Sequence, residues 1–387
     1  MSPLPPLEVE LAQLAQARRT RILTSLDGPS RSHPQRGNRL ISSFASNDYL
    51  GLAHHPSVLD AAREAADRHG FGAGAARLVT GHLPPHDDLE QALAGLVGLP
   101  AALLFPTGYQ ANLGVVTSLA GPDDLIVSDQ MNHASIIDGC RLSRARIAIY
   151  PHANATAARV ALATPGTFRR RLLITESLFS MDGDRAPLTD LALAAREAGA
   201  TLIVDEAHAL GVLGPSGAGL CRAAGITPDV LVGTLGKAFG SLGGFAAGTS
   251  VLRDYLINRS RPFIYTTGTP APVAAAALAA LRVSLSPEGD QRRRSLQAAI
   301  ASLHVGLQTI ALPHPLPPPG PIVPVVIGSD ADVLALSARL AQADLFVPAI
   351  RPPTVPEGTA RLRITLSADH RSEDVAHLLE VLIPALK

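Results

Sequence analysis

The chain has 387 residues, enough for a sizeable core and more than one domain. Its 33 Lys and Arg residues balance its 33 Asp and Glu residues, so the net charge favours neither a nucleic-acid nor a membrane partner. Cys140 and Cys221 lie far apart without a CxxC motif, which excludes a disulfide framework and a zinc ribbon and indicates a reducing compartment. The N-terminus lacks the pattern of a signal peptide, and no stretch resembles a membrane span. These features predict a soluble, cytoplasmic protein.

Short apolar runs alternate with longer, Ala-rich segments along most of the chain. A helical pattern covers residues 7–23. Strands are predicted at residues 101–105, 125–127, 172–175, 201–205, 230–233 and 244–247, and helices at 57–68, 86–97, 110–119 and 188–198. Continuously apolar strands that alternate with helices predict an α/β fold, with a mostly parallel sheet covered on both faces.

A proline-rich run at residues 312–320 separates this pattern from a second set of elements. The second set is a strand at 322–327, a helix at 330–343, a strand at 361–365 and a helix at 372–382, which together predict a small α+β domain. We therefore expect an N-terminal helical segment over residues 1–40, a large domain over 41–285 and a small C-terminal domain over 286–387.

The segment Gly233-Thr-Leu-Gly-Lys237-Ala-Phe-Gly-Ser241 places one lysine among glycines, directly after a predicted strand. A lysine with a lowered pKa and a fixed approach to a carbonyl is a candidate Schiff-base nucleophile. A phosphate-binding P-loop is excluded, because it needs four residues before its Gly-Lys pair and a Ser or Thr after it. An exposed lysine on a tight turn is the alternative that this segment alone leaves open.

A carboxylate ends another predicted strand, in Asp205-Glu-Ala-His208. Ligands of open α/β sheets bind beyond the carboxyl ends of the strands, so Asp205 is expected at the same rim as Lys237. There it could keep a pyridine nitrogen protonated, which makes the ring an electron sink. His208 could reach a phenolic oxygen on that ring. A metal-binding pair or a self-satisfied buried Asp–His pair is the alternative.

Three further segments are expected at this rim. Gly108 and Tyr109 open a helix, whose free N–H groups suit a phosphate and whose aromatic ring suits a planar ligand. His133 lies on a loop after a strand and could stack on a planar cofactor. The segment from Glu176 to Ser180 offers carboxylate and hydroxyl groups. Each segment is weak evidence by itself, but their convergence on one sheet edge predicts a cofactor site.

At these residues the chain resembles the α-oxoamine synthase family of pyridoxal-phosphate enzymes, which have the aspartate-aminotransferase-like fold (fold type I). The matching motifs run in the family's order over nearly the whole chain: Ser46-Asn-Asp-Tyr-Leu-Gly-Leu52, Thr107-Gly-Tyr-Gln-Ala-Asn112, His133-Ala-Ser-Ile-Ile-Asp-Gly139, Phe179-Ser-Met-Asp-Gly-Asp184, Asp205-Glu-Ala-His208 and Thr234-Leu-Gly-Lys237. The resemblance implies pyridoxal 5'-phosphate as cofactor, no metal, and a mostly parallel seven-stranded sheet with a smaller C-terminal α+β domain.

The resemblance also implies roles for individual residues. Lys237 would carry the cofactor as a Schiff base, Asp205 would pair with its pyridine nitrogen and His208 would bond its ring oxygen. His133 would stack on the ring, where it would also meet the substrate. The remaining cofactor contacts would come from Gly108, Tyr109, Ser180, Thr234, Thr266 and Thr267. The segment Tyr265-Thr-Thr267 resembles one that reaches a phosphate in the neighbouring subunit, which implies a homodimer with its active site at the interface.

The segment from Thr354 to Arg363 resembles family members of the biotin pathway, which condense L-alanine with a pimeloyl thioester of coenzyme A or of acyl carrier protein. Arg363 would bind the amino-acid carboxylate through its fork, and Thr354 would lie near the substrate. A solvent-facing strand arginine is the alternative for Arg363. Arg21 is predicted as a further substrate arginine, with Arg18 and Arg19 as alternatives. Members that condense glycine with acetyl-CoA share every cofactor residue and remain the alternative activity.

Two motifs indicate other classes of function, but the sequence around each of them does not support it. Gly70-Phe-Gly-Ala-Gly74-Ala matches the loose spacing of a dinucleotide-binding loop, which would make the chain a non-catalytic or NAD-binding α/β protein. That motif follows a predicted helix instead of a strand, so its context fails. His82 and His86 have a spacing found in zinc sites, but the two prolines between them are incompatible with the helical geometry such a pair needs.

Overall fold

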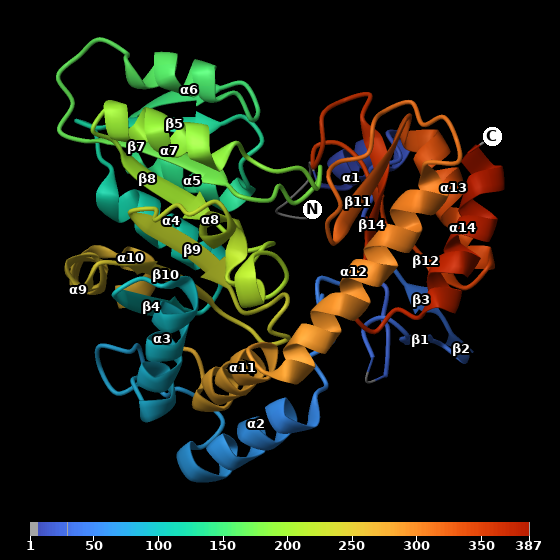
Figure 1. Cartoon of the computed structure of the whole chain (residues 1–387), viewed down its shortest axis with the longest axis horizontal. Helices are drawn as coiled ribbons and strands as arrows, with labels where there is room; N and C mark the ends of the chain where they lie inside the picture. The colour runs from blue at the N-terminus through green and yellow to red at the C-terminus, as the bar shows by residue number, and fades with distance from the viewer. Residues whose placement is uncertain (1–6, 29, 387) are drawn as a thin grey trace. The chain divides into compact units, whose positions relative to one another are not determined.

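The computed structural model describes residues 7–28 and 30–386 (Figure 1). Residues 1–6, on which the absence of a signal-peptide pattern partly rested, lie outside this description. Within it, no helix is long and apolar enough to cross a membrane. The chain divides into two compact units: a larger one of Asn47–Ser180 and Asp184–Arg294, and a smaller one of Met1–Ser46, Met181–Gly183 and Ser295–Lys387.

A seven-stranded sheet forms the centre of the larger unit, in the order β4-β10-β9-β8-β7-β5-β6. Its strands are β4 (Ala101–Phe105), β5 (Leu125–Asp129), β6 (Arg146–Tyr150), β7 (Arg171–Glu176), β8 (Thr201–Asp205), β9 (Val230–Thr234) and β10 (Gly244–Gly248). Only β10 is antiparallel to its neighbours, so the predicted mostly parallel, seven-stranded sheet is confirmed. Individual apolar runs predicted six of these strands. The seventh, β6, was not predicted, although Ile147–Tyr150 is an apolar run; it is an edge strand with a largely exposed surface.

Helices cover both faces of this sheet. One face packs against α4 (Gly108–Leu119), α5 (Ala134–Ser143), α9 (Ser250–Arg259) and α10 (Arg261–Ile264). The other packs against α6 (Ala155–Leu162), α7 (Leu188–Glu197) and α8 (Gly219–Ala223). Three more helices pack together in the same unit: α2 (Pro56–His69), α3 (Pro84–Val97) and α11 (Ala271–Ser284). Because five neighbouring strands are parallel, their carboxyl ends lie along one edge of the sheet.

The smaller unit contains an antiparallel sheet of β11 (Ile322–Gly328), β14 (Ala360–Thr365) and β13 (Ala349–Ile350). Two helices, α13 (Asp330–Gln342) and α14 (Ser372–Leu386), accompany it, as the sequence predicted. A short strand β12 (Leu345–Phe346) pairs in parallel with β3 (Ser42–Ser43), and β1 (Gln35–Arg36) pairs with β2 (Arg39–Leu40). The helix α12 (Pro287–Leu307) belongs to the larger unit at its start and to the smaller unit from Ser295.

The predicted N-terminal helix over residues 7–23 is too long. The helix α1 covers Leu7–Gln16 only, and the residues after it leave the helical conformation. Arg18 has a φ of 56°, a left-handed conformation that typically ends a helix. The arginines at this point therefore lie on an extended segment, which frees them to reach different partners.

Candidate active site

A cavity of about 150 Å³ lies in the larger unit at the carboxyl ends of its strands. Seven of the predicted site residues line it: Gly108, Tyr109, His133, Asp205, His208, Thr234 and Lys237. The other lining residues are Asn112, Ser135, Glu176, Ala207, Val232 and Gly233. Residues from five separate segments of the chain thus meet in one small space, as their predicted positions at strand ends require.

The loop that carries Lys237 is fixed by backbone contacts. The N–H of Leu235 donates to the carbonyl of Gly243 at 2.9 Å, and the N–H of Gly240 donates to the carbonyl of Lys237 at 2.9 Å. Gly240 has a φ of 56°, and a Cβ there would lie 2.3 Å from the backbone nitrogen of Ala53. Only glycine fits at position 240, three residues after the lysine. The turn gives Lys237 a defined, partly buried position at the cavity.

Asp205 is a buried carboxylate held by two donors. Its Oδ2 accepts a hydrogen bond of 2.6 Å from Nδ2 of Asn112, and its Oδ1 accepts one of 2.8 Å from the N–H of Ala207. The side chain of Asn112 also donates to the hydroxyl of Ser135 at 3.0 Å. Within the described residues no cluster of three or more potential metal ligands exists.

His208 is held by a tyrosine that the sequence did not single out as a site residue. The hydroxyl of Tyr49 lies 2.7 Å from Nδ1 of His208, and Tyr49 is fully buried. Tyr49 comes from the Ser46–Leu52 motif, so this contact gives that motif a structural role. It fixes the orientation of the imidazole, because a hydrogen bond to one ring nitrogen also determines where the other points.

His133 is the N-cap of α5, and its Nδ1 accepts a hydrogen bond from the N–H of Ser135 at 3.2 Å. Its ring lies edge-on to that of Tyr109, with centroids 6.5 Å apart and an interplanar angle of 77°. Burial lowers the pKa of His133, Asp205 opposes this, and Lys237 lowers the pKa further. A neutral imidazole at this point suits stacking on a planar ring.

The start of α4 approaches the ends of β9 and β10 very closely. The hydroxyl of Thr107 caps the helix by accepting from the N–H of Gln110 at 3.1 Å. A Cβ at Gly244 would lie 2.5 Å from the Cα of Gly108, and a Cβ at Gly108 would lie 3.4 Å from the side chain of Thr234. This close approach brings the first amides of α4 and the Thr234 side chain together, an arrangement that suits a phosphate group.

The remaining predicted cofactor residues of the larger unit are not among those that line the cavity. Ser180 is the last residue before the short segment that belongs to the smaller unit. Thr266 Oγ1 accepts a hydrogen bond of 3.4 Å from Nε2 of Gln110, and Thr267 follows it. The predicted contacts of these three residues with the cofactor therefore stay predictions.

Of the predicted substrate residues, His133 lies in the larger unit, and Arg21, Thr354 and Arg363 lie in the smaller unit. Nη2 of Arg21 donates to Oγ1 of Thr354 at 3.3 Å, so the structure brings these two predicted residues together. Arg19 instead forms an ion pair with Glu357 at 2.7 Å. Arg363 lies in β14 and is only 5% exposed, which excludes the alternative of a solvent-facing strand arginine.

Three residues near the cavity were not predicted as site residues: Tyr49, Asn112 and Ser135. Glu176 was expected at this rim, but without an individual role. Asn112 belongs to the motif Thr107–Asn112, and Ser135 belongs to the motif His133–Gly139. Asn112 follows Gly108 by four residues and so shares its face of α4, a spacing that could have identified it. Glu176 closes β7 as Asp205 closes β8, and the two are paired in register.

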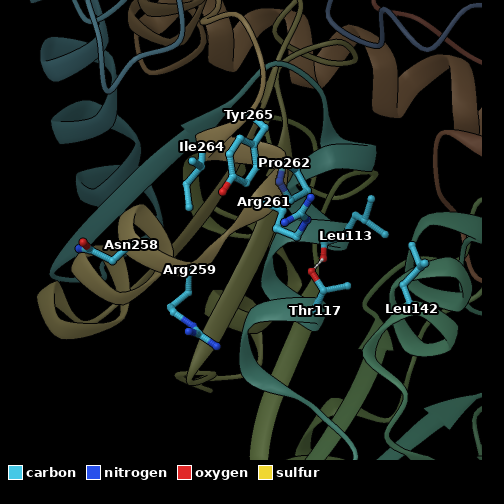
Figure 2. Close-up of a pocket in the computed structure, with 9 residues that line it drawn as sticks. All are labelled: Leu113, Thr117, Leu142, Asn258, Arg259, Arg261, Pro262, Ile264 and Tyr265. Carbon is cyan, nitrogen blue, oxygen red and sulfur yellow. Dashed lines mark hydrogen bonds between the residues drawn. The ribbon is translucent and has the colours of Figure 1, made fainter.

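A second cavity in the larger unit, of about 620 Å³, is larger but has different chemistry (Figure 2). Its lining includes Arg259, Arg261 and the exposed ring of Tyr265. It has neither a lysine nor a carboxylate nor an imidazole in its wall. We therefore assign the chemistry to the smaller cavity, where all three kinds of group meet.

The residues of the smaller cavity fit pyridoxal 5'-phosphate. Its wall supplies a lysine amine, a hydrogen-bonded carboxylate for a pyridine nitrogen, an imidazole for ring stacking and a helix N-terminus for a phosphate. Two buried polar atoms, Oδ1 of Asn112 and Oε1 of Glu176, have no partner within the described residues. Buried polar atoms are normally satisfied, so these two are suited to a bound ligand.

Comparisons with known proteins agree with this assignment. Residues 41–382 match the family of class I and II aminotransferases. The 8-amino-7-oxononanoate synthase of Methylococcus capsulatus is 51% identical over 352 residues, 89% of each chain. That of Halorhodospira halophila is 49% identical over 99% of this chain and 95% of its own.

Solved structures also match over the whole chain. A serine palmitoyltransferase from S. paucimobilis, with PLP and myriocin bound, superposes with a TM-score of 0.92 at 29% identity, covering 99% of this chain and 97% of its own. The 8-amino-7-oxononanoate synthase of Francisella tularensis superposes with a TM-score of 0.77 at 28% identity, covering 88% and 96%. The fold is therefore that of a fold type I enzyme, and its cofactor is pyridoxal 5'-phosphate. The chain belongs to the class I and II aminotransferase family and, within it, to the 8-amino-7-oxononanoate synthases.

Proposed function

We propose that this chain condenses L-alanine with a pimeloyl thioester and releases carbon dioxide and the thiol, which yields 8-amino-7-oxononanoate for biotin synthesis. A C–C bond forms between Cα of alanine and the thioester carbonyl carbon, the C–S bond breaks, and the alanine carboxylate leaves as carbon dioxide. The observation that carries the proposal is the meeting of Lys237, Asp205, His208 and His133 in one cavity of a chain about half identical to such synthases.

The cofactor supplies an electron sink for the carbanion formed at Cα. Lys237 moves the protons: its Nζ takes the proton from Cα of alanine and later returns one to the product. Asp205 holds a proton on the pyridine nitrogen through its negative charge, and the hydrogen bonds from Asn112 and Ala207 fix that carboxylate in place. His208, oriented by Tyr49, donates to the ring oxygen.

Substrate recognition is assigned to the smaller unit. Arg363 would bind the carboxylate of alanine with its planar fork, and Arg21, together with Thr354, would bind the acyl substrate. Ser180, Thr266 and Thr267 would help to hold the cofactor. The thioester carrier is either coenzyme A or acyl carrier protein. Two unpaired, buried cysteines, Cys140 and Cys221, favour a cytoplasmic location.

The activity is tested with two pairs of substrates. The purified protein should have a visible absorption band that L-alanine perturbs, and it should turn over L-alanine with pimeloyl-CoA. Turnover of glycine with acetyl-CoA alone would move the assignment to the related C-acetyltransferase activity. A Lys237→Ala variant should lose turnover, and normal turnover by this variant would overturn the assignment.

We also propose that the enzyme is a homodimer whose cofactor site includes Thr266 and Thr267 of the second subunit. The exposed ring of Tyr265, 71% accessible in the single chain, stands next to these threonines and lines the larger cavity, where a second subunit would cover it. Sedimentation should give twice the mass of the chain.

Subunit mixing tests the shared site. A Lys237→Ala protein and a Thr266→Val, Thr267→Val protein should each have little activity. If the threonines act across the interface, a mixed dimer regains one intact site, because one site then receives the normal lysine and the normal threonines. Absence of any recovery after exchange of subunits would show that each chain completes its own site.

A further inference from the structure

Glu176 is the buried polar residue of the cavity to which the mechanism gives no role. It is the last residue of β7 and pairs in register with Asp205 at the end of β8. It lines the cavity together with Lys237 and is only 3% exposed. Its backbone N–H donates to Oδ1 of Asn132 at 3.1 Å, so the strand end is fixed and its side chain has a defined position.

The carboxyl group of Glu176 is only half satisfied. The backbone N–H of His133 interacts with it, but Oε1 has no partner within the described residues. Asp205 next to it differs, because both of its oxygens accept hydrogen bonds. A buried polar atom that faces a cavity without a partner is costly, and a ligand group that pairs with it removes that cost.

The charges around Glu176 determine which form of the carboxyl group is present. Two negative groups act on it, Asp205 on β8 and Asp129 on β5, together with one cation, Lys237. Burial is the largest influence and raises the pKa of Glu176 well above its ordinary value. Asp205 raises the pKa further, while Lys237 and the amide of His133 only partly oppose them. Two neighbouring carboxylates repel each other, so a pair with one negative charge and one proton has a lower free energy than a pair with two negative charges.

We propose that Glu176 is a further cofactor-binding residue, which acts as a neutral carboxylic acid and donates a hydrogen bond to an electron-rich acceptor atom of pyridoxal 5'-phosphate. The division of roles follows from the geometry: Asp205, with two donors, carries the negative charge, and Glu176, with an open oxygen, carries the proton. This inference rests on the cofactor and not on the identity of the acyl substrate.

Two substitutions separate the neutral acid from a carboxylate. Glu176→Gln keeps the shape, the neutrality and a donor, whereas Glu176→Met keeps the length but removes all hydrogen bonding. Each protein is stripped of cofactor and titrated with pyridoxal 5'-phosphate in the absence of amino acid and thioester. Thermal melting of the stripped proteins serves as the control for folding.

We expect the Gln variant to bind the cofactor within about threefold of the wild type, and the Met variant to bind about tenfold more weakly, because it loses one hydrogen bond in a buried site. Equal weakening in both variants would mean that an ionised carboxylate is required, and equal affinity in all three proteins would mean that Glu176 makes no contact. Either result overturns the inference. Failure of the proposed function would appear separately, as the wrong substrate pair in wild-type turnover with cofactor binding intact.

Discussion

Two aspartate–histidine pairs lie near the carboxyl ends of the strands of the seven-stranded sheet, and their surroundings differ. Asp205 is the last residue of β8, and His208 follows three residues later. Asn112 holds the carboxylate, Tyr49 holds the imidazole, and both Asp205 and His208 line the cavity. Asp129 ends β5, and His152 follows β6. In that second pair the imidazole is clamped between two carboxylates, with Nδ1 2.9 Å from Asp129 and Nε2 2.7 Å from Asp184.

The two pairs differ in whether the polar groups around them line the cavity. Asp129 has a fully buried side chain, and its oxygens accept from His152 and from the N–H groups of Met131 and Ala153. Beside Asp205, Oδ1 of Asn112 and Oε1 of Glu176 have no partner within the described residues, and both residues line the cavity. In the clamp, Oδ1 of Asp184 also has none, but Asp184 is not among the residues that line this cavity. The same residue types thus form a closed structural clamp in one place and an open ligand site in the other.

The largest effect should come from Asp205→Asn, which changes the open pair with almost no change in shape. Turnover should fall by about 10²-fold or more, because the charge that keeps the pyridine nitrogen protonated is lost. The unfolding temperature should change little. Asn112 can rotate its amide and offer Oδ1, which has no partner within the described residues, to the new amide. Steady-state kinetics and thermal melting check both parts, and a large loss of stability would contradict the description of an open pair.

Asp129→Asn should have the opposite outcome. It leaves the partly buried His152 with a poorer partner at a fully buried position, and it should lower the free energy of unfolding by about 3 kcal/mol. Turnover per folded molecule should fall much less than in Asp205→Asn. Urea unfolding and activity at low temperature measure the two quantities. Full stability together with lost turnover would mean that this pair belongs to the active site after all.

The clamp should also make stability depend on pH. Burial lowers the pKa of His152, but its hydrogen bonds and charge interactions with Asp129 and Asp184 outweigh this and raise the pKa to about 10. A pKa raised from 6.5 means that the protonated ring stabilises the fold fully below about pH 6.5 and that this contribution is lost as the pH rises toward 10. Urea unfolding over this range should show the decline in the wild type and a smaller one in His152→Gln. Equal declines would contradict a protonated clamp.

The sequence predicted the open pair but not the closed one, for a physical reason. Asp205 ends an apolar strand, and Lys237 follows another among glycines, so their placement follows from local pattern and sheet geometry. His152 follows β6, an exposed edge strand that was not predicted, and its partners lie 23 and 32 residues away in the chain. Pairings between distant segments leave no periodic signal in the sequence.

The same limit explains the other differences. The choice among Arg18, Arg19 and Arg21 depended on which of them meets Glu357 or Thr354, more than 300 positions later. The premature end of α1 at Gln16 is set by the left-handed backbone of Arg18, which is not a glycine and so gave no breaker signal. The buried position of Arg363 depends on its neighbours in the sheet of the smaller unit.

The smallest effect is expected from Tyr49→Phe, which removes the hydroxyl that orients His208 in the open pair. Turnover should fall about fivefold and the free energy of unfolding by about 1 kcal/mol, since the hydrogen bonds of this hydroxyl with His208 and with Oδ1 of Asn47 are lost while the packing stays. Tyr255→Phe is the matched control. Its hydroxyl donates to the carbonyl of Ser118 at 3.1 Å, and neither residue lines the cavity, so stability should fall similarly and turnover should not. If both variants lose turnover in proportion to stability, Tyr49 only supports the fold, and the open pair is oriented by other contacts.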